Sequence, residues 1–103
     1  MRVLFDQGTP VPLRDSLPQH EVSTAFERGW SALKNGDLLD AAEREGFAVL
    51  VTTDTKLKFQ QNLTARRVAI VVLLTTSWPR IERASAEVAK AIGAATPGSY
   101  TEV

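Results

Sequence analysis

The sequence contains no cysteine and a single histidine, His20. A disulfide framework and a cysteine-bound zinc site are therefore excluded, and so is a metal site built from several histidines. Any metal ion bound by this chain would be held by oxygen ligands, which favour Mg²⁺ or Mn²⁺. His20 belongs to no recognisable motif, and we assign it no catalytic role.

Long apolar runs are also lacking. The longest, residues 68–74, is far too short to cross a bilayer. At the start of the chain, charged residues interrupt the sequence before the apolar region of a signal peptide could form. We therefore expect a soluble, cytoplasmic protein that makes no membrane contact.

The chain has no net charge, because its 12 basic residues balance its 12 acidic residues. Their distribution is nevertheless uneven. Residues 1–54 carry nine acids and five bases, whereas residues 55–83 carry six bases and one acid. The acidic half could hold a cation and the basic stretch could contact phosphates. An ordinary mixed surface explains the same counts, which by themselves slightly favour it.

The most informative stretch is residues 47–54, an unbroken apolar run that is rich in β-branched residues and ends in Asp54. Such a run is typical of a parallel strand buried on both faces. Further strands are predicted over residues 2–5, 20–24 and 68–74, with 20–24 at the sheet edge because it is the least apolar.

Helical segments are predicted between these strands: a weak helix over residues 11–17, a clear one from Asn35 to a C-cap at Gly46, a short helix or turn after Asp54, and a last helix over 80–92. The sequence therefore predicts one α/β domain over residues 1–95. Its sheet would be mostly parallel and roughly four-stranded, with helices on both faces. Residues 96–103 are predicted to form a flexible C-terminal tail.

Three aspartates are expected at the carboxyl edge of this sheet, where open α/β sheets bind ligands. Asp6 and Asp54 follow strands, and Asp37 lies in the first turn of a helix. Each has a simpler explanation: Asp37 can interact with its helix dipole, and Asp6 and Asp54 can accept hydrogen bonds in turns. Together they favour a divalent metal site, since unrelated turn aspartates need not share one edge.

The segments that carry these acids, Leu4–Gln7, Asn35–Leu39 and Leu50–Asp54, resemble the compact bacterial PIN-like proteins, relatives of the ribonuclease domains of VapC-type toxins. The resemblance covers roughly residues 1–75. It implies a PIN-like three-layer α/β/α sandwich whose acidic residues hold Mg²⁺ or Mn²⁺ for RNA cleavage. Matched by position, Asp6 resembles the first-strand aspartate, Asp37 the acid at the helix start, and Asp54 the aspartate after the third strand.

PIN domains usually have a fourth acid farther along the chain, and here the matching region contains Gln60, Gln61 and Asn62. Asn62 could supply a carbonyl ligand or orient a water, so we place it in the catalytic set with the three aspartates. Phe59 and Trp30 could stack on unpaired bases, although core packing is the commoner role of such aromatics. The residues predicted to bind RNA phosphates are Lys56, Lys58, Arg66 and Arg67.

The sequence thus predicts a PIN-like, divalent-metal-dependent ribonuclease with RNA as its substrate. Family analogy alone extends this to the toxin of a toxin–antitoxin pair, whose partner would be a cognate antitoxin protein. Small relatives often form homodimers, for which the apolar last helix could serve.

Two other interpretations stay open. A degenerate PIN-like module would bind RNA or a protein partner without cleavage, because the fourth acid is missing. A phospho-receiver domain would place Asp6, Asp54 and Thr75 or Thr76 at strand ends. It would, however, need a second acid where Gln7 stands, and a lysine after a fifth strand.

Overall fold

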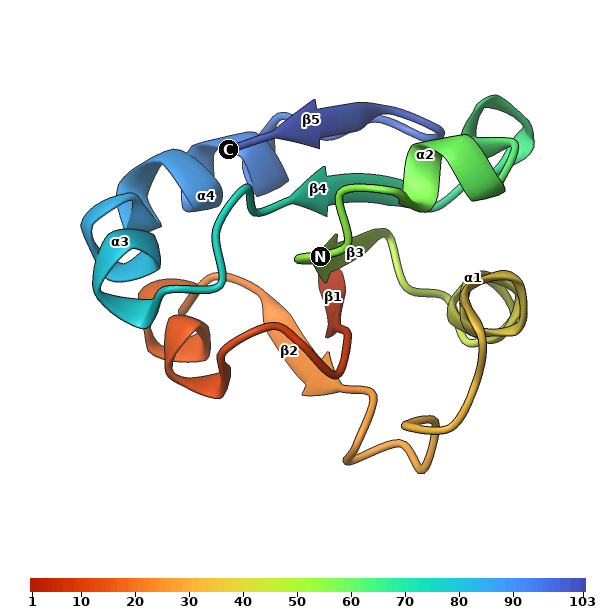
Figure 1. Ribbon diagram of the computed structural model, residues 1–103, viewed down its shortest axis with the longest axis horizontal. Helices are drawn as coiled ribbons and strands as arrows, with labels where there is room; N and C mark the ends of the chain where they lie inside the picture. Colours follow the sequence, from red (N-terminus) through yellow and green to blue (C-terminus); the bar gives the residue numbers. More distant parts are fainter.

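Five parallel strands form the central sheet of the computed structural model, which describes residues 1–103 (Figure 1). They lie side by side in the order β2-β1-β3-β4-β5. The predicted α/β architecture is confirmed, whereas the sheet has five strands rather than four, and all its pairings are parallel. The strands are β1 (Arg2–Phe5), β2 (Glu21–Thr24), β3 (Val49–Thr52), β4 (Ala69–Val72) and β5 (Tyr100–Glu102).

Helices cover both faces of the sheet (Figure 1). One face packs against α1 (Asn35–Arg44), α2 (Leu57–Gln60) and the short 3₁₀ helix η2 (Leu63–Ala65). The other packs against the 3₁₀ helix η1 (Val11–Ser16), α3 (Trp78–Arg83) and α4 (Ser85–Gly93). This arrangement is compatible with a three-layer α/β/α fold.

The side chains of each central strand alternate between two hydrophobic cores. In β1, Val3 and Phe5 join the core beneath η1 and α4, while Leu4 joins the core beneath α1. In β3, Val51 and Leu50 divide in the same way. Because both faces of these strands are buried, their sequences are continuous apolar runs rather than alternating ones.

The segment predicted to be a flexible tail instead contains β5. This strand has only three residues, of which Thr101 and Glu102 are polar. It therefore lacks the apolar pattern by which strands are predicted. Backbone hydrogen bonds hold it against β4, for example from Val103 N to Val72 O at 2.8 Å. Gly98 turns the chain into β5 with a φ of +76°, and a Cβ there would lie 2.9 Å from the carbonyl oxygen of Arg66. Glycine is therefore required at this position.

The predicted last helix is two helices, α3 and α4, separated at Ala84. No proline or glycine marks this break in the sequence. Both helices reach the sheet, because Ile81 of α3 and Val88 and Ile92 of α4 share one core. Val88 and Ile92 of α4 are thus buried inside the domain, and the homodimer stays a prediction. No helix combines the length and the apolar character that a bilayer-crossing segment requires.

Candidate functional site

The topological switch point of the sheet lies between β1 and β3. From β1 the chain moves outward to β2, and from β3 it moves to β4 on the other side. Open α/β sheets bind ligands outside the carboxyl ends of the strands at such a point. Asp6 directly follows β1, and Asp54 lies just beyond the end of β3. The structure therefore brings two of the three predicted aspartates to the ends of neighbouring strands.

Thr52, the last residue of β3, connects these two aspartates. Its hydroxyl donates a hydrogen bond to Oδ2 of Asp6 and accepts one from the backbone N–H of Asp54 at 3.0 Å. Thr52 is fully buried, whereas the two aspartates that it contacts are partly exposed. We did not predict a role for this residue. The only signal in the sequence is a hydroxyl side chain at the end of an otherwise apolar strand.

The other oxygen of Asp6 is held by the turn that follows β1. Oδ1 accepts hydrogen bonds from the backbone N–H of Gly8 at 3.2 Å and from the hydroxyl of Thr9 at 2.7 Å. The buried Thr9 hydroxyl also lies 2.9 Å from the carbonyl oxygen of Val51, so it links the turn to β3. The turn-stabilising role considered for Asp6 is thus present, and it fixes the carboxylate in place.

Asn35, the first residue of α1, ties that helix to Asp54. Its Nδ2 donates hydrogen bonds to Oδ2 of Asp54 at 2.9 Å and to Oε1 of Gln60 at 3.0 Å. Oδ1 of Asp54 accepts a hydrogen bond from the backbone N–H of Lys56 at 2.9 Å. The start of α1 is therefore fixed beside Asp54, although 19 residues separate the two positions.

Asp37 lies in the first turn of α1, two residues after Asn35. Its side chain is exposed and makes no hydrogen bond or ion pair. No three histidine or acidic side chains in the structure are arranged to hold a metal ion. Asp6 and Asp54 thus lie at one edge of the sheet, whereas no contact joins Asp37 to them.

Asn62, the predicted fourth member of the catalytic set, has no hydrogen bond to the aspartates. It precedes η2, and its Oδ1 accepts a hydrogen bond from the hydroxyl of Thr64 at 2.8 Å. In this segment Gln60 is the residue connected to the site, through its bond with Asn35. Spacing along the chain could not distinguish the two, because α2 lies between Asp54 and Asn62.

Three of the four predicted phosphate-binding residues lie within ion-pair distance of acids of this chain. The Lys58 ammonium lies 3.1 Å from Glu102 and contacts the rings of Phe59 and Tyr100. Arg66 pairs with Asp40 and, at 2.9 Å, with Glu43. Lys56 makes no ion pair and is exposed. Nε of Arg67 lies 4.0 Å from Oε2 of Glu43, but the Arg67 side chain is 84% exposed. These last two remain the accessible cations.

The pKa values of two groups beside Lys58, Tyr100 and Glu102, differ from their ordinary values. Burial, together with a hydrogen bond to Glu102, raises the pKa of Tyr100 to about 12. The hydrogen bond from Lys58 lowers the pKa of Glu102.

Phe59 is 77% exposed and so does not fill the core, whereas Trp30 packs edge-on against Phe47 with ring centroids 6.0 Å apart. Of the two aromatics considered for stacking, Phe59 is the more accessible, because Trp30 is partly buried against the core.

Replacing Glu43 by glutamine should expose a pH-dependent part of the stability. Burial raises the pKa of Glu43, but hydrogen bonds from the Arg66 side chain and the Arg67 backbone outweigh it and hold the pKa below the ordinary 4.5. A lowered pKa stabilises the fold above about pH 4.5, and this contribution disappears as the pH falls through the folded-state pKa. We expect E43Q to lower the free energy of unfolding by about 1–3 kcal/mol at neutral pH.

Urea unfolding at neutral pH and near the acid limit of stability measures this difference between wild type and E43Q. The gap should narrow in acid, where both proteins have lost the charged pair. Asp40→Asn provides the control, because Asp40 contacts the same arginine but is mostly exposed, and its effect should stay below about 1 kcal/mol. A gap that is independent of pH would assign the effect to packing rather than to charge.

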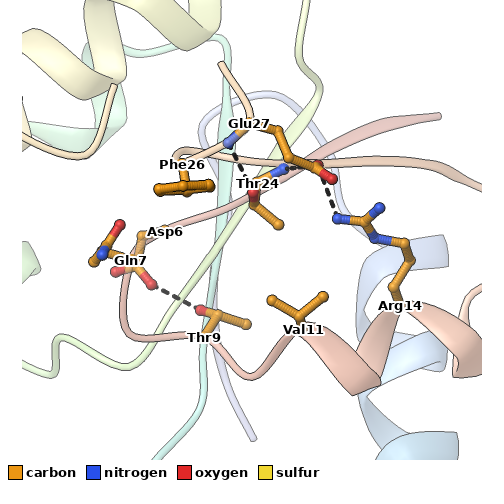
Figure 2. A pocket seen from close by; sticks show the side chains of 8 residues that line it. All are labelled: Asp6, Gln7, Thr9, Val11, Arg14, Thr24, Phe26 and Glu27. Atoms are coloured by element: carbon orange, nitrogen blue, oxygen red, sulfur yellow. Dashed lines mark hydrogen bonds and ion pairs between the residues drawn. The ribbon is translucent and has the colours of Figure 1, made fainter. Parts of the chain in front are cut away.

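A pocket of about 340 Å³ opens at the same edge, between the ends of β1 and β2 (Figure 2). Arg14 and Glu27 form an ion pair across it at 2.8 Å, and this hydrogen bond lowers the pKa of Glu27. The same carboxylate oxygen accepts a hydrogen bond from the backbone N–H of Thr24 at 2.9 Å. Only Asp6 among the lining residues was predicted. The lining consists of Asp6, Gln7, Thr9, Val11, Arg14, Thr24, Phe26 and Glu27.

Comparisons of the chain with protein-family models, with curated proteins and with solved structures return no significant match. The resemblance to PIN-like proteins therefore rests on the short motifs around Asp6, Asp37 and Asp54. The chemistry of the site itself has to support any function.

Proposed function

We propose that the chain is a PIN-like, Mg²⁺- or Mn²⁺-dependent ribonuclease whose site lies at the carboxyl ends of β1 and β3. The main support is the connection of Asp6 and Asp54 through the buried hydroxyl of Thr52. Two carboxylates are held next to each other at the switch point of a parallel sheet, the place where such sheets bind ligands. Side chains that hydrogen bonds already hold in position cost little to organise when a ligand arrives.

The donor set suits a hard divalent cation, since every candidate ligand is an oxygen. A carboxylate offers about four acceptor sites. Asp6 uses three of them and Asp54 two, so both retain capacity for a cation. Asp37 would be the third acid, and no hydrogen bond holds its side chain away from the pair. A cation bound there would activate water and neutralise the charge that develops on a phosphate.

RNA would approach this edge from the side of α2. Lys56 is the cation best suited to contact a phosphate, because it is exposed and its backbone N–H is bonded to Asp54. Arg67 could contribute farther along the strand. Lys58 and Arg66 would contribute less, since their acidic partners within the chain already compensate their charge. A role as the toxin of a toxin–antitoxin pair, with an antitoxin as partner, extends this proposal by resemblance alone.

A phospho-receiver domain is the second candidate, because the strand order β2-β1-β3-β4-β5 is one that receiver proteins share. Asp54 would then be the phosphorylated residue. Gln7 stands where the second acid of that site is expected, so the set of acids is incomplete. Incubation with acetyl phosphate distinguishes the two candidates: a receiver gains the mass of one phosphoryl group on Asp54, and the nuclease gains none.

Titration of the ¹⁵N-labelled protein with Mn²⁺ tests the proposed metal site directly, because the paramagnetic ion broadens the NMR signals of nearby amides. We expect broadening centred on Asp6, Asp37 and Asp54 at millimolar metal or below, and none at Asp15, an exposed acid on η1. A matched Mg²⁺ titration should shift the same signals without broadening them. Broadening confined to other acids, or none at millimolar Mn²⁺, would contradict the nuclease proposal.

A further inference from the structure

We propose that the pocket between β1 and β2 binds one unpaired base of the RNA substrate. This inference rests on the proposed function, because Asp6 belongs both to the acidic edge and to the pocket wall. Its volume of about 340 Å³ lies within the range of small-molecule sites, about 300–1,000 Å³. An occupant would lie directly beside the carboxylate of Asp6 (Figure 2).

An exposed aromatic ring forms one side of the pocket. Phe26 follows β2 and is 75% exposed, so it contributes little to either core. In Figure 2 its ring stands near Asp6 and Gln7, and Val11 lies farther along the opposite side. Accessible aromatic rings are the surfaces on which proteins stack unpaired bases. The pocket thus combines a stacking surface with an aliphatic side chain.

Polar groups with unused hydrogen-bonding capacity complete the lining. Gln7 is exposed and its amide makes no hydrogen bond within the chain. Both hydrogen bonds to the Glu27 carboxylate use Oε1, which leaves Oε2 without a partner. Nε of Arg14 is the one buried side-chain polar atom in the molecule that lacks a partner. Unused polar groups around a pocket are typical of ligand sites, and they match the donors and acceptors on the edge of a base.

The charge of the pocket favours a base over a phosphate. Its titratable groups are Asp6, Glu27 and Arg14, two acids and one base. Arg14 is already paired with Glu27, and the uncompensated charge is therefore that of Asp6. A phosphate placed inside would be repelled, whereas a neutral heterocycle with N–H donors would be accepted. The phosphates of the same strand would then lie outside the pocket, toward the Asp6–Asp54 edge.

Fluorescence anisotropy with a labelled hexaribonucleotide, in EDTA to prevent cleavage, tests this assignment. Phe26→Ala should weaken binding about tenfold or more, the usual effect of losing one stacked base. Phe26→Trp should bind as wild type does, because it keeps the stacking surface. Leu74→Ala is the control, since this side chain is also exposed, at 56%, but follows β4 and does not line the pocket, and it should change binding less than about twofold.

The proposal would be overturned if Phe26→Ala binds the hexamer as wild type does, or if Leu74→Ala weakens binding equally. A free nucleoside monophosphate that binds as tightly as the hexamer would also overturn it, by assigning the pocket to free nucleotides. Cleavage of a longer RNA in Mn²⁺ separates this proposal from the nuclease proposal. If the protein cleaves RNA but hexamer binding does not depend on Phe26, only the base-pocket proposal is refuted. If hexamer binding depends on Phe26 but no RNA is cleaved, the pocket proposal is supported and only the nuclease proposal is refuted.

Discussion

In the proposed nuclease, replacing Asp54 by asparagine is expected to reduce metal-dependent RNA cleavage by about 10²–10³-fold, the usual cost of losing one preorganised electrostatic group. The substitution removes the negative charge and introduces an NH₂ donor. In either orientation of the amide, this donor faces another donor, the Asn35 side chain or the Lys56 backbone N–H. Asp6→Asn should have an effect of similar size, since Asp6 shares the buried Thr52 hydroxyl with Asp54.

Single-turnover cleavage of a labelled RNA in Mg²⁺ and in Mn²⁺ measures the loss, and circular dichroism establishes that each variant is folded. Asp15→Asn is the matched control because it removes one exposed acid of η1, outside the Asp6–Asp54 edge, and its rate should stay within about twofold of wild type. Wild-type rates in both Asp6→Asn and Asp54→Asn would show that cleavage occurs elsewhere or comes from a contaminant.

Replacing Leu13 by alanine is expected to cost about 2–5 kcal/mol of unfolding free energy, as in other buried leucines. Leu13 is 0% exposed and belongs to the core that η1 shares with α4 and the sheet. The total free energy of unfolding of a domain of this size is about 5–15 kcal/mol, so the loss is a large fraction of its stability. The melting temperature should fall by roughly 10–20 °C. The stability of η1 also matters for the pocket, because Arg14 is the next residue.

Urea unfolding of Leu13→Ala and Leu74→Ala makes the comparison with the residue type held constant. Leu74 is 56% exposed, and its truncation should cost less than about 1 kcal/mol. Similar m-values for the two variants and wild type would show that the denatured state is unchanged. A cost below about 1 kcal/mol for Leu13→Ala would mean that η1 is not an integral part of the core.

Part of the site could be anticipated from the sequence because parallel strands place their carboxyl ends at one edge. Asp6 and Asp54 each follow an apolar run closely. Their proximity could therefore be predicted once β1 was expected to pair with β3. The hydrogen bonds of Thr52 and Asn35 could not be anticipated in this way. Each of these hydrogen bonds joins residues from different elements of the fold. The sequence pattern alone does not show which side chains of two such elements come into contact. The pocket beside Asp6 likewise depends on how η1 and the turn after β2 face each other.

The sequence by itself determined the parallel α/β class and the strands β1, β3 and β4, because strands buried on both faces require continuous apolar runs. Only the tertiary structure decided that residues 100–102 form β5, since backbone hydrogen bonds to β4 hold this half-polar segment without an apolar pattern. It also decided that Arg66 pairs with Asp40 and Glu43 of α1. The acid with which a cation pairs is the one that lies close to it in space, because the attraction between charges weakens with distance. Separation along the sequence does not reveal that distance.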